Sequence, residues 1–523
     1  MTHDEIPNIP KDRTITYARV VVDFRPQKED PHRIRITAGG NLINYPGELS
    51  TWTADLTTSK LMWNSVLSTE GAKYMCLDIK NFYLSAPLDR FEYMKIPLAL
   101  FPKWTSDQYD LTKHALNGFV YLEMRRAVWG LPQAGILANK LLRKRLLPHG
   151  YYECANTPGL WKHVSRPISF TLVVDDFGIK YLREEDLNHL IKSIEQYYEV
   201  KVDKEGKEFV KIELDWDYDN RKVHLSMKPY LDKALRQFNN VTPTTRHDSP
   251  YPHVEPTYGA KQQYAAYDKS PPASKEDQKR VQKVNGKFLW YGRSVDGTML
   301  TPLSALASQQ TKPTIETMHR VKQFLDYAAS QEPAVLTYRK SDMVLAIHSD
   351  ASYLNEENAR SRAGGHHFLS ENVPFPPNNG AIHNVAEIIK GVMSSAAEAE
   401  LGSLYINARK GVEERIILTK MGHPQPPTPI QVNNSTAESI VNNRVQPKRT
   451  KAMDMRFHWL RDRETQKQFR FYWRTGVLNY ADYWTKHHPA AHHRNIRPEF
   501  LTSPTALAQL REKLARRSLA RVC

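Results

Sequence analysis

The order of strand-like and helix-like segments predicts an α+β protein, built as two mixed domains joined by a helical connector. In each half of the chain, apolar strand-like runs are followed by segments with apolar residues at helical spacing, which is typical of mixed domains. Between the halves, helical periodicity recurs over 281–291 and 315–329. We find no internal repeat.

The first half begins with a basic hairpin. Apolar and basic positions alternate over 13–45 and end at Gly39 and Gly40, a pattern that predicts two paired strands. The elements expected next are a helix over 54–67 capped by Asp55, a strand over 73–79 that delivers Asp78, a helix over 134–147 stopped by Pro148 and Gly150, and a strand, two-residue turn and strand over 168–181 with Asp175 and Asp176 at the tip.

The second half follows a segment without periodicity. Residues 242–275 are rich in Pro, Ser, Thr, Tyr and His, which predicts a linker or long connection. The elements expected after the connector are a strand over 343–349 followed directly by Asp350, a helix over 394–410, and short strands over 430–432 and 469–473.

Composition indicates a folded protein with a nucleic-acid partner. The 523 residues suggest about three or four domains, and 40% hydrophobic with 25% charged residues excludes a disordered chain. Lys and Arg number 73 against 57 Asp and Glu, which gives a formal net charge of +16. Such an excess favours nucleic acid as the partner, although it says nothing about the fold.

The sequence also bears on compartment. The longest apolar run, over 168–174, is too short to span a bilayer, and residues 1–13 lack the apolar core of a secretory signal. Three scattered cysteines exclude a disulfide framework or a zinc knuckle. We therefore expect an intracellular protein, in a cytoplasmic particle or the nucleus, that is not secreted and binds no membrane.

Asp175 and Asp176 are adjacent carboxylates at a predicted hairpin tip between apolar strands. Two like charges there are costly unless a cation lies between them, and Mg²⁺ prefers oxygen ligands. A solvated Asp–Asp turn is the commoner meaning of such a pair taken alone, because Asp is a frequent turn residue.

The context of these residues resembles a known family. The segments 77–84, 129–135 and 173–176 have the order and spacing of the palm motifs of reverse transcriptases. From about Arg19 to Arg494 the chain resembles the polymerase and ribonuclease H part of a copia-type LTR retrotransposon polyprotein. The resemblance implies a right-hand-like polymerase of fingers, palm and thumb, followed by a ribonuclease H-like α/β domain.

The resemblance implies roles for residues of the first half. It makes Asp78, Asp175 and Asp176 the catalytic, metal-binding carboxylates of the polymerase, with Mg²⁺ or Mn²⁺ as the cofactor. The residues implied in nucleotide binding are Tyr83 as the steric gate under the sugar, Gln133 at the incoming nucleotide, and Arg33 and Arg35 at the triphosphate. A packing role for Tyr83 and a solvated basic strand for the two arginines remain open.

A second set of carboxylates resembles the ribonuclease H site. Asp350, Glu400 and Asp482 match three of its catalytic, metal-binding positions, and Glu400 is favoured over Glu398 because small and apolar residues follow it at helical spacing. A helix cap or a solvated face would be the commoner meaning of each one alone. Three in family order indicate a site.

The fourth carboxylate of that site is missing. Asn433 stands where the family has Asp, and an amide offers a neutral oxygen without a negative charge. Two metal ions would be less well neutralised, so we expect weak cleavage. Glu438 is the nearest acidic substitute, and on the helix expected there it would point away from the strand end.

Two other features of the sequence give weaker evidence of a function. The histidine-rich segment 487–493 could bind a borderline metal, but it lacks cysteines at matching spacing. The basic residues of the C-terminal tail follow a helical pattern that favours a solvated helix, and they are Arg511, Lys513, Arg516, Arg517 and Arg521.

The sequence therefore predicts an RNA-directed DNA polymerase with an impaired ribonuclease H domain. Its expected partners are an RNA template, a DNA primer, an RNA–DNA hybrid and deoxynucleoside triphosphates. The expected parts are fingers and palm over 1–220, thumb and connection over 221–335, a ribonuclease H-like domain over 336–490 and a basic tail over 491–523. The alternative is a truncated, decayed remnant that only binds nucleic acid, because Met1 opens close to the fingers.

Overall fold

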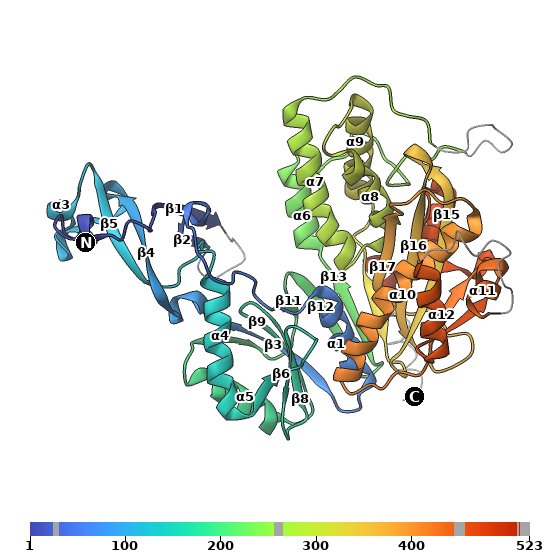
Figure 1. Ribbon diagram of the computed structural model, residues 1–523, viewed down its shortest axis with the longest axis horizontal. Helices are drawn as coiled ribbons and strands as arrows, with labels where there is room; N and C mark the ends of the chain where they lie inside the picture. Colours follow the sequence, from blue (N-terminus) through green and yellow to red (C-terminus); the bar gives the residue numbers. More distant parts are fainter. Residues whose placement is uncertain (25–30, 256–264, 444–454, 510–511, 513–523) are drawn as a thin grey trace. The chain divides into compact units, whose positions relative to one another are not determined.

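The computed structural model describes the chain except residues 25–30, 256–264, 444–454, 510–511 and 513–523. It divides into two compact units (Figure 1), the first comprising Met1–Asp55 with Met75–Lys204 and the second Leu56–Tyr74 with Glu205–Cys523. Helices and sheets occur in both units, so the predicted α+β fold class is confirmed. The finer division into four parts stays a prediction, and the tail residues from Arg511 to Arg521 named above lie outside the described residues.

The first unit contains two sheets. One has the strand order β2-β1-β4-β5, formed by β1 (Ile15–Phe24), β2 (His32–Ala38), β4 (Pro87–Pro97) and β5 (Phe119–Arg126). The other has the order β10-β3-β9-β8-β7-β6, formed by β3 (Lys73–Ile79), β6 (Tyr151–Glu153), β7 (Leu160–His163), β8 (Ile168–Val173), β9 (Asp176–Tyr181) and β10 (Val200–Asp203). The main helices are α4 (Ala134–Leu146) and α5 (Glu184–Glu195), with the shorter α2 (Lys103–Gln108) and α3 (Leu111–His114).

Alternation explains the basic hairpin. β1 and β2 pair antiparallel, with Val22 opposite Ile34 and Asp23 opposite Arg33. Since side chains alternate between the faces of a strand, the apolar pairs lie on one face and Arg33 and Arg35 on the other. The prediction of a hairpin over 13–45 is confirmed for the described residues.

Buried leucines hold α4 and α5 against the second sheet. Leu142 of α4 and Leu190 of α5 are fully buried in one core with Phe170 and Phe177 of the sheet. Burial of each such side chain stabilises the fold by about 1.5–3 kcal/mol. Leu142→Ala would cost about 2–5 kcal/mol, because it would also leave a cavity.

The second unit also contains two sheets. A four-stranded sheet has the order β11-β12-β13-β14, formed by β11 (Glu208–Phe209), β12 (Ile212–Asp217), β13 (Lys222–Ser226) and β14 (Leu336–Arg339). A five-stranded sheet has the order β17-β16-β15-β18-β19, formed by β15 (Val344–Glu356), β16 (Arg360–Ser370), β17 (Ala381–Ile388), β18 (Thr428–Val432) and β19 (Phe469–Trp473). In the latter β15, β16 and β17 pair antiparallel, whereas β18 runs parallel to β15 and to β19.

Helices cover these sheets. They are α1 (Leu56–Ser68), α6 (Lys228–Gln237), α7 (Lys275–Ser294), α8 (Leu300–Gln309), α9 (Ile315–Ser330), α10 (Ala396–Lys420), α11 (Ser435–Val441), α12 (Met455–Thr465) and α13 (Ala490–Ile496). The long helix α10 packs on β15 and β16 and carries α12 beside it (Figure 1). None of the helices in the described part of the chain is both long and apolar enough to cross a membrane.

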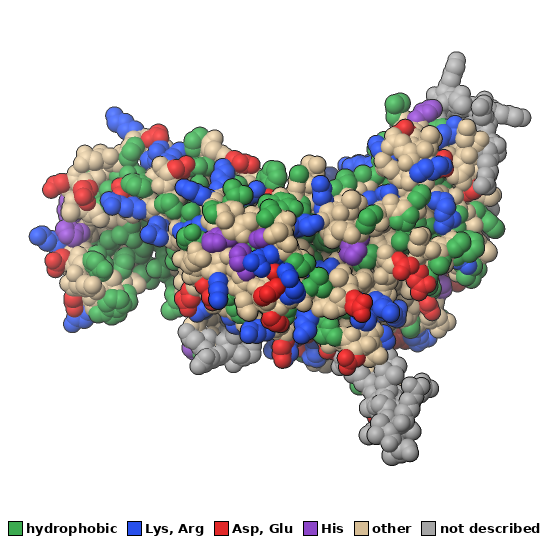
Figure 2. Space-filling view, turned by 90° about the horizontal axis from the view of Figure 1, so that it is seen from below, with side chains coloured by type: hydrophobic (Ala, Val, Ile, Leu, Met, Phe, Trp, Pro, Cys, Tyr) green, Lys and Arg blue, Asp and Glu red, His purple; other side chains and the backbone are tan. Residues whose placement is uncertain are grey.

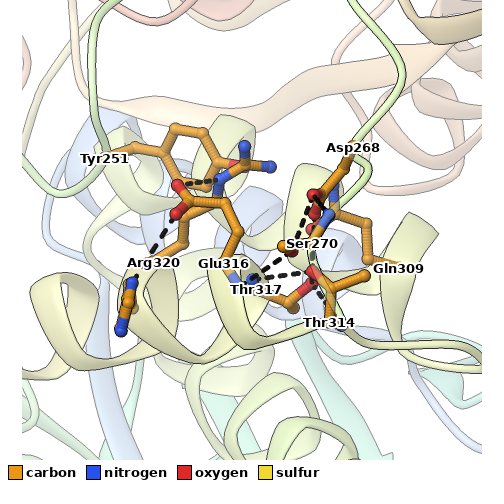
Figure 3. A network of polar contacts seen from close by, with 9 residues as sticks. Tyr251, Asp268, Ser270, Gln309, Thr314, Glu316, Thr317 and Arg320 are labelled. Atoms are coloured by element: carbon orange, nitrogen blue, oxygen red, sulfur yellow. Dashed lines mark hydrogen bonds and ion pairs between the residues drawn. The ribbon is translucent and has the colours of Figure 1, made fainter. Parts of the chain in front are cut away.

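The predicted connection over 242–275 contains no helix or strand in its described residues before α7 begins at Lys275. Its end is nevertheless fixed to the start of α9 (Figure 3). Thr314 donates its hydroxyl to Asp268 at 2.5 Å, and the main-chain amide of Glu316 donates to the hydroxyl of Ser270 at 3.3 Å. Thr314 is also the N-cap of α9, so one side chain starts the helix and holds the connection.

Candidate active sites

The first candidate site lies where β3 ends beside the turn between β8 and β9. The main-chain amide of Ile79 donates to the carbonyl oxygen of Asp175 at 3.1 Å, which holds the turn against the strand that carries Asp78. The turn differs from the prediction by one residue. Val174 and Asp175 form it, and Asp176 is already the first residue of β9, paired with Val173.

The shift has a backbone cause. Val174 has φ +60°, in the left-handed region that β-branched residues rarely adopt. A two-residue hairpin turn favours positive φ because it must match the right-handed twist of its strands. The expectation that Asp175 and Asp176 form the turn together was therefore wrong, although both carboxylates remain at this edge of the sheet.

Charges converge at Asp175. Burial, and next the charge of Asp78, raise the pKa of the Asp175 carboxyl above its usual range, and Arg35 and Arg33 oppose this rise. The structure thus brings Asp78, Asp175 and the two arginines within electrostatic reach. A raised pKa from a like-charged neighbour is the signature of a place that a cation would stabilise.

Tyr83 belongs to the same neighbourhood. Burial first, and then the charge of Asp175, raise the pKa of its hydroxyl. Its ring also packs against the core beside Phe82, with ring centroids 5.9 Å apart. Tyr83 is therefore placed both to pack and to face the carboxylates, and the gate role stays a prediction.

Arg33 and Arg35 line a cavity of about 430 Å³ whose other walls are mainly apolar. The guanidinium of Arg35 lies 5.6 Å from the ring centroid of Trp129, and its Nε is buried without a hydrogen-bond partner. A buried donor in this state favours an acceptor such as a phosphate oxygen.

Gln133 bonds to a carboxylate other than the three predicted ones. Its side chain is fully buried and donates Nε2–H to Oε1 of Glu92 at 3.1 Å. Glu92 is buried too, and burial raises the pKa of its carboxyl. Sequence reasoning missed Glu92, because a Glu in a strand gives no sign of a partner 41 positions away. Contact between Gln133 and a nucleotide stays a prediction, and it would require this buried bond to break.

Gly130 lies very close to the backbone of the basic hairpin. It has φ +96°, and a Cβ there would lie 2.1 Å from the carbonyl oxygen of Ala38. Ala38 in turn donates its amide to the carbonyl of Trp129 at 2.8 Å. Gly130 therefore allows the segment 129–135 to approach the end of the basic hairpin closely.

The second candidate site lies at the middle of the five-stranded sheet. Asp350 is in β15, Glu400 is in the first turns of α10, Asn433 follows β18, and Asp482 is in the 3₁₀ turn η10 (Tyr480–Trp484). Asp350 is 3% and Glu400 7% exposed. The structure brings all four predicted positions together.

Two glycines allow this convergence. Gly364 and Gly365 of β16 lie opposite Asp350 and Ser349. A Cβ on Gly364 would lie 2.4 Å from the carbonyl oxygen of Ala481 in η10, and one on Gly365 would lie 1.8 Å from Oδ1 of Asn407 in α10. Without side chains at these positions, the elements bearing Asp482 and Glu400 can both approach the strand of Asp350.

The electrostatics of this site are strongly perturbed. Burial, followed by the charge of Asp482, raises the pKa of Asp350 to about 7. Burial, followed by the charge of Asp350, raises the pKa of Glu400 well above its usual range. Oε2 of Glu400 and Oδ1 of Asn433 are buried without hydrogen-bond partners. Unpartnered oxygens among like charges fit a divalent cation.

Two cationic or donor groups already contact these carboxylates. Asn433 donates Nδ2–H to Oδ1 of Asp350 at 2.5 Å, and Lys486 donates Nζ–H to Oδ1 of Asp482 at 2.6 Å. Glu398 is partly buried and accepts from the amide and hydroxyl of Ser394, so it caps the start of α10. The sequence analysis assigned no role at this site to Lys486.

No group of three or more His, Cys, Asp or Glu side chains in the described residues has the arrangement of a ready metal site. This holds for the histidine-rich segment as well. His493 contacts the hydroxyls of Tyr327 at 2.6 Å and Tyr483 at 2.7 Å through its two ring nitrogens, and burial lowers its pKa to about 4. His487 stacks on Tyr251. These histidines pack the second unit. At both carboxylate sites, a cation would have to draw the oxygens closer together.

Comparison with known proteins finds a curated polyprotein and a solved structure that are similar to this chain. No family model matches the chain. The chain is 21% identical over 402 residues to the retrovirus-related Pol polyprotein from transposon TNT 1-94 of Nicotiana tabacum, which covers 74% of this chain and 28% of that protein. The chain thus spans little more than a quarter of this curated relative.

Among solved structures, the chain is similar to the foamy viral protease-reverse transcriptase dRH in complex with double-stranded DNA. The TM-score is 0.49 at 10% identity, with 90% of this chain and 68% of that chain covered. The ordered motifs and the two carboxylate sites are consistent with the likeness to the tobacco polyprotein, and the chain is similar to a retrotransposon Pol polyprotein.

Proposed function

We propose that the chain is an RNA-directed DNA polymerase of a copia-type retrotransposon. The observation that carries this proposal is the main-chain bond of 3.1 Å from Ile79 to Asp175, which holds the turn of Asp175 beside the strand of Asp78. Burial and the charge of Asp78 raise the pKa of Asp175 there, and Arg35 and Arg33 oppose the rise. A carboxylate pair next to cations is what phosphoryl transfer needs, because a triphosphate must be held while charge moves to its leaving group. The relation to a Pol polyprotein supports the same function.

The predicted site residues of the first unit would have different roles in this reaction. Asp78 and Asp175, with Asp176 at the start of β9, would hold two Mg²⁺ ions, which when bound supply activation of the primer hydroxyl and neutralisation of the leaving pyrophosphate. Arg35, with its unpartnered Nε, would receive a phosphate oxygen. Tyr83 would lie against the sugar and reject a 2′-hydroxyl.

The second unit would bind the RNA–DNA hybrid with weak cleavage. Asp350, Glu400 and Asp482 are the residues that would hold a divalent ion there, and such an ion would supply an activated water. Asn433 gives no fourth negative charge and instead donates to Asp350. Two ions would therefore be poorly neutralised at this site.

Primer extension tests the main function. Purified protein, a homopolymer RNA template with a DNA primer, deoxynucleotides and Mg²⁺ should give extended primer, and the variant Asp78→Asn should give none. Binding of the primer and template without extension in the parent chain would instead identify a nucleic-acid-binding remnant.

A further inference from the structure

A buried chain of polar contacts runs from α10 to the main chain of Asp350. Its members are Glu414, His367, Asn407, Ser403 and Ser349, of which Glu414 is 2% exposed and the others are fully buried. Polar groups in such surroundings are costly unless each finds a partner.

The contacts fix the orientation of Asn407. Its Nδ2 donates to the carbonyl oxygen of Gly364 at 3.0 Å and to Oγ of Ser349 at 3.1 Å. These two acceptors bind the amide hydrogens of Asn407. Its Oδ1 therefore faces His367, whose Nε2–H donates to it at 2.9 Å. The other ring nitrogen of His367, Nδ1, lies 2.7 Å from Oε2 of Glu414, so a proton lies between these two atoms.

The last contact reaches the site. Ser403, one turn before Asn407 on α10, donates its hydroxyl to the carbonyl oxygen of Asp350 at 2.6 Å. These contacts therefore end on the backbone of Asp350, whose carboxyl has a pKa that burial and the charge of Asp482 both raise.

We propose that Glu414, His367, Asn407 and Ser403 are positioning residues that hold the backbone of Asp350 in place for a divalent cation. The carboxylates of Asp350, Glu400 and Asp482 repel one another, and Asn433 adds no charge that would attract a second cation. The four positioning residues hold Asp350 in its place among these carboxylates. The metal-binding part of this proposal rests on the proposed nuclease site, whereas the positioning part does not.

The test uses the full chain with Asp78→Asn and Asp175→Asn, so that Mn²⁺ titration followed by electron paramagnetic resonance reports on the second unit. Deuterium exchange of residues 346–352 without metal reports on the strand itself. The variants are Asn407→Leu, which keeps the size of the side chain, and Ser403→Ala, which removes only the hydroxyl. If Asn407→Leu does not fold, Ser403→Ala alone tests the proposal.

The matched control is Asn379→Leu. Asn379 is also buried, and its amide donates to two main-chain carbonyls, those of Arg339 at 3.0 Å and Leu369 at 2.9 Å. The two Asn→Leu variants should lose similar thermal stability. Only Asn407→Leu and Ser403→Ala should speed exchange at 346–352 and weaken Mn²⁺ binding, by about 10- to 100-fold for Asn407→Leu.

Each outcome decides something. Unchanged exchange and unchanged Mn²⁺ affinity in both variants would overturn the proposal, as would equal changes in Asn379→Leu. If the parent binds no Mn²⁺ in its second unit, the proposed nuclease site is wrong. Deuterium exchange of residues 346–352 alone then decides whether the buried polar contacts position Asp350.

Discussion

Asn433 donates its side-chain amide to the carboxylate of Asp350 at 2.5 Å, at the position where a metal-binding Asp was expected. Besides lacking a charge, Asn433 thus occupies one oxygen that a cation would need. Its own Oδ1 is buried without a partner.

Asn433→Asp should raise cleavage of an RNA–DNA hybrid while leaving primer extension intact. A fourth carboxylate replaces the donor, which favours binding of divalent ions at this site. Hybrid cleavage and primer extension are measured side by side. Asn434→Asp is the control, because it adds the same charge at the N-cap of α11, where Asp also caps well. Brisk cleavage by the parent, with no gain in Asn433→Asp, would contradict the idea of an impaired nuclease.

Asp175→Asn should abolish primer extension with an unchanged or raised melting temperature. Burial and Asp78 disfavour the charge of Asp175 in the folded chain, so removing that charge relieves a cost. Asp186→Asn is the contrast, since Asp186 is bonded to Arg166 at 2.8 Å and Arg183 at 2.7 Å. That variant should melt several degrees lower. Full extension by Asp175→Asn would remove this residue from catalysis.

Tyr83→Ala should incorporate ribonucleotides with a much smaller penalty than the parent shows. The ring that blocks the 2′-hydroxyl would be gone, whereas Tyr83→Phe keeps the ring and should keep the discrimination. The ratio of deoxyribonucleotide to ribonucleotide incorporation is the measurement. An equal ratio in Tyr83→Ala and the parent would leave Tyr83 as a packing residue against Phe82.

Without metal, the second unit should lose stability as the pH rises from about 4 to about 7. The folded chain raises the pKa of Asp350 from 3.8 to about 7, so the folded state holds its proton more tightly than the unfolded state does. The stability from this proton is complete below about pH 4 and is lost as the pH rises through about 7. Melting curves in chelator should show a smaller decline for Asp350→Asn, and identical declines would contradict this.

Affinity for a duplex should fall steeply with salt. A chain of net charge +16 that neutralises several phosphates releases their counterions, with a slope of about −0.9 per phosphate in log affinity against log salt. On the face drawn in Figure 2, Lys and Arg side chains are interspersed with Asp and Glu. An affinity that does not change with salt would mean that basic and acidic side chains are interspersed over the whole surface and that no basic cleft is present.

Sequence predicted most elements of the second unit that carry the site. Asp350 and Glu400 lie in elements with a local pattern, a strand and a helix, whereas Asp482 was placed by the resemblance alone and lies in a 3₁₀ turn. β16 was not predicted, because nearly all its residues are buried, so it lacks alternation, and because Gly364 and Gly365 are poor strand formers. The partners of Gln133 and His367 are contacts distant in sequence, which no local pattern encodes.

The glycine pair in β16 has a consequence for inheritance. Glycine and alanine codons differ by a single base, and one methyl group at Gly364 or Gly365 would collide with η10 or α10. A Gly364→Ala or Gly365→Ala change should therefore disturb the second candidate site while every acidic residue is retained. A comparison of related sequences that scores acidic residues alone would therefore overlook such a substitution.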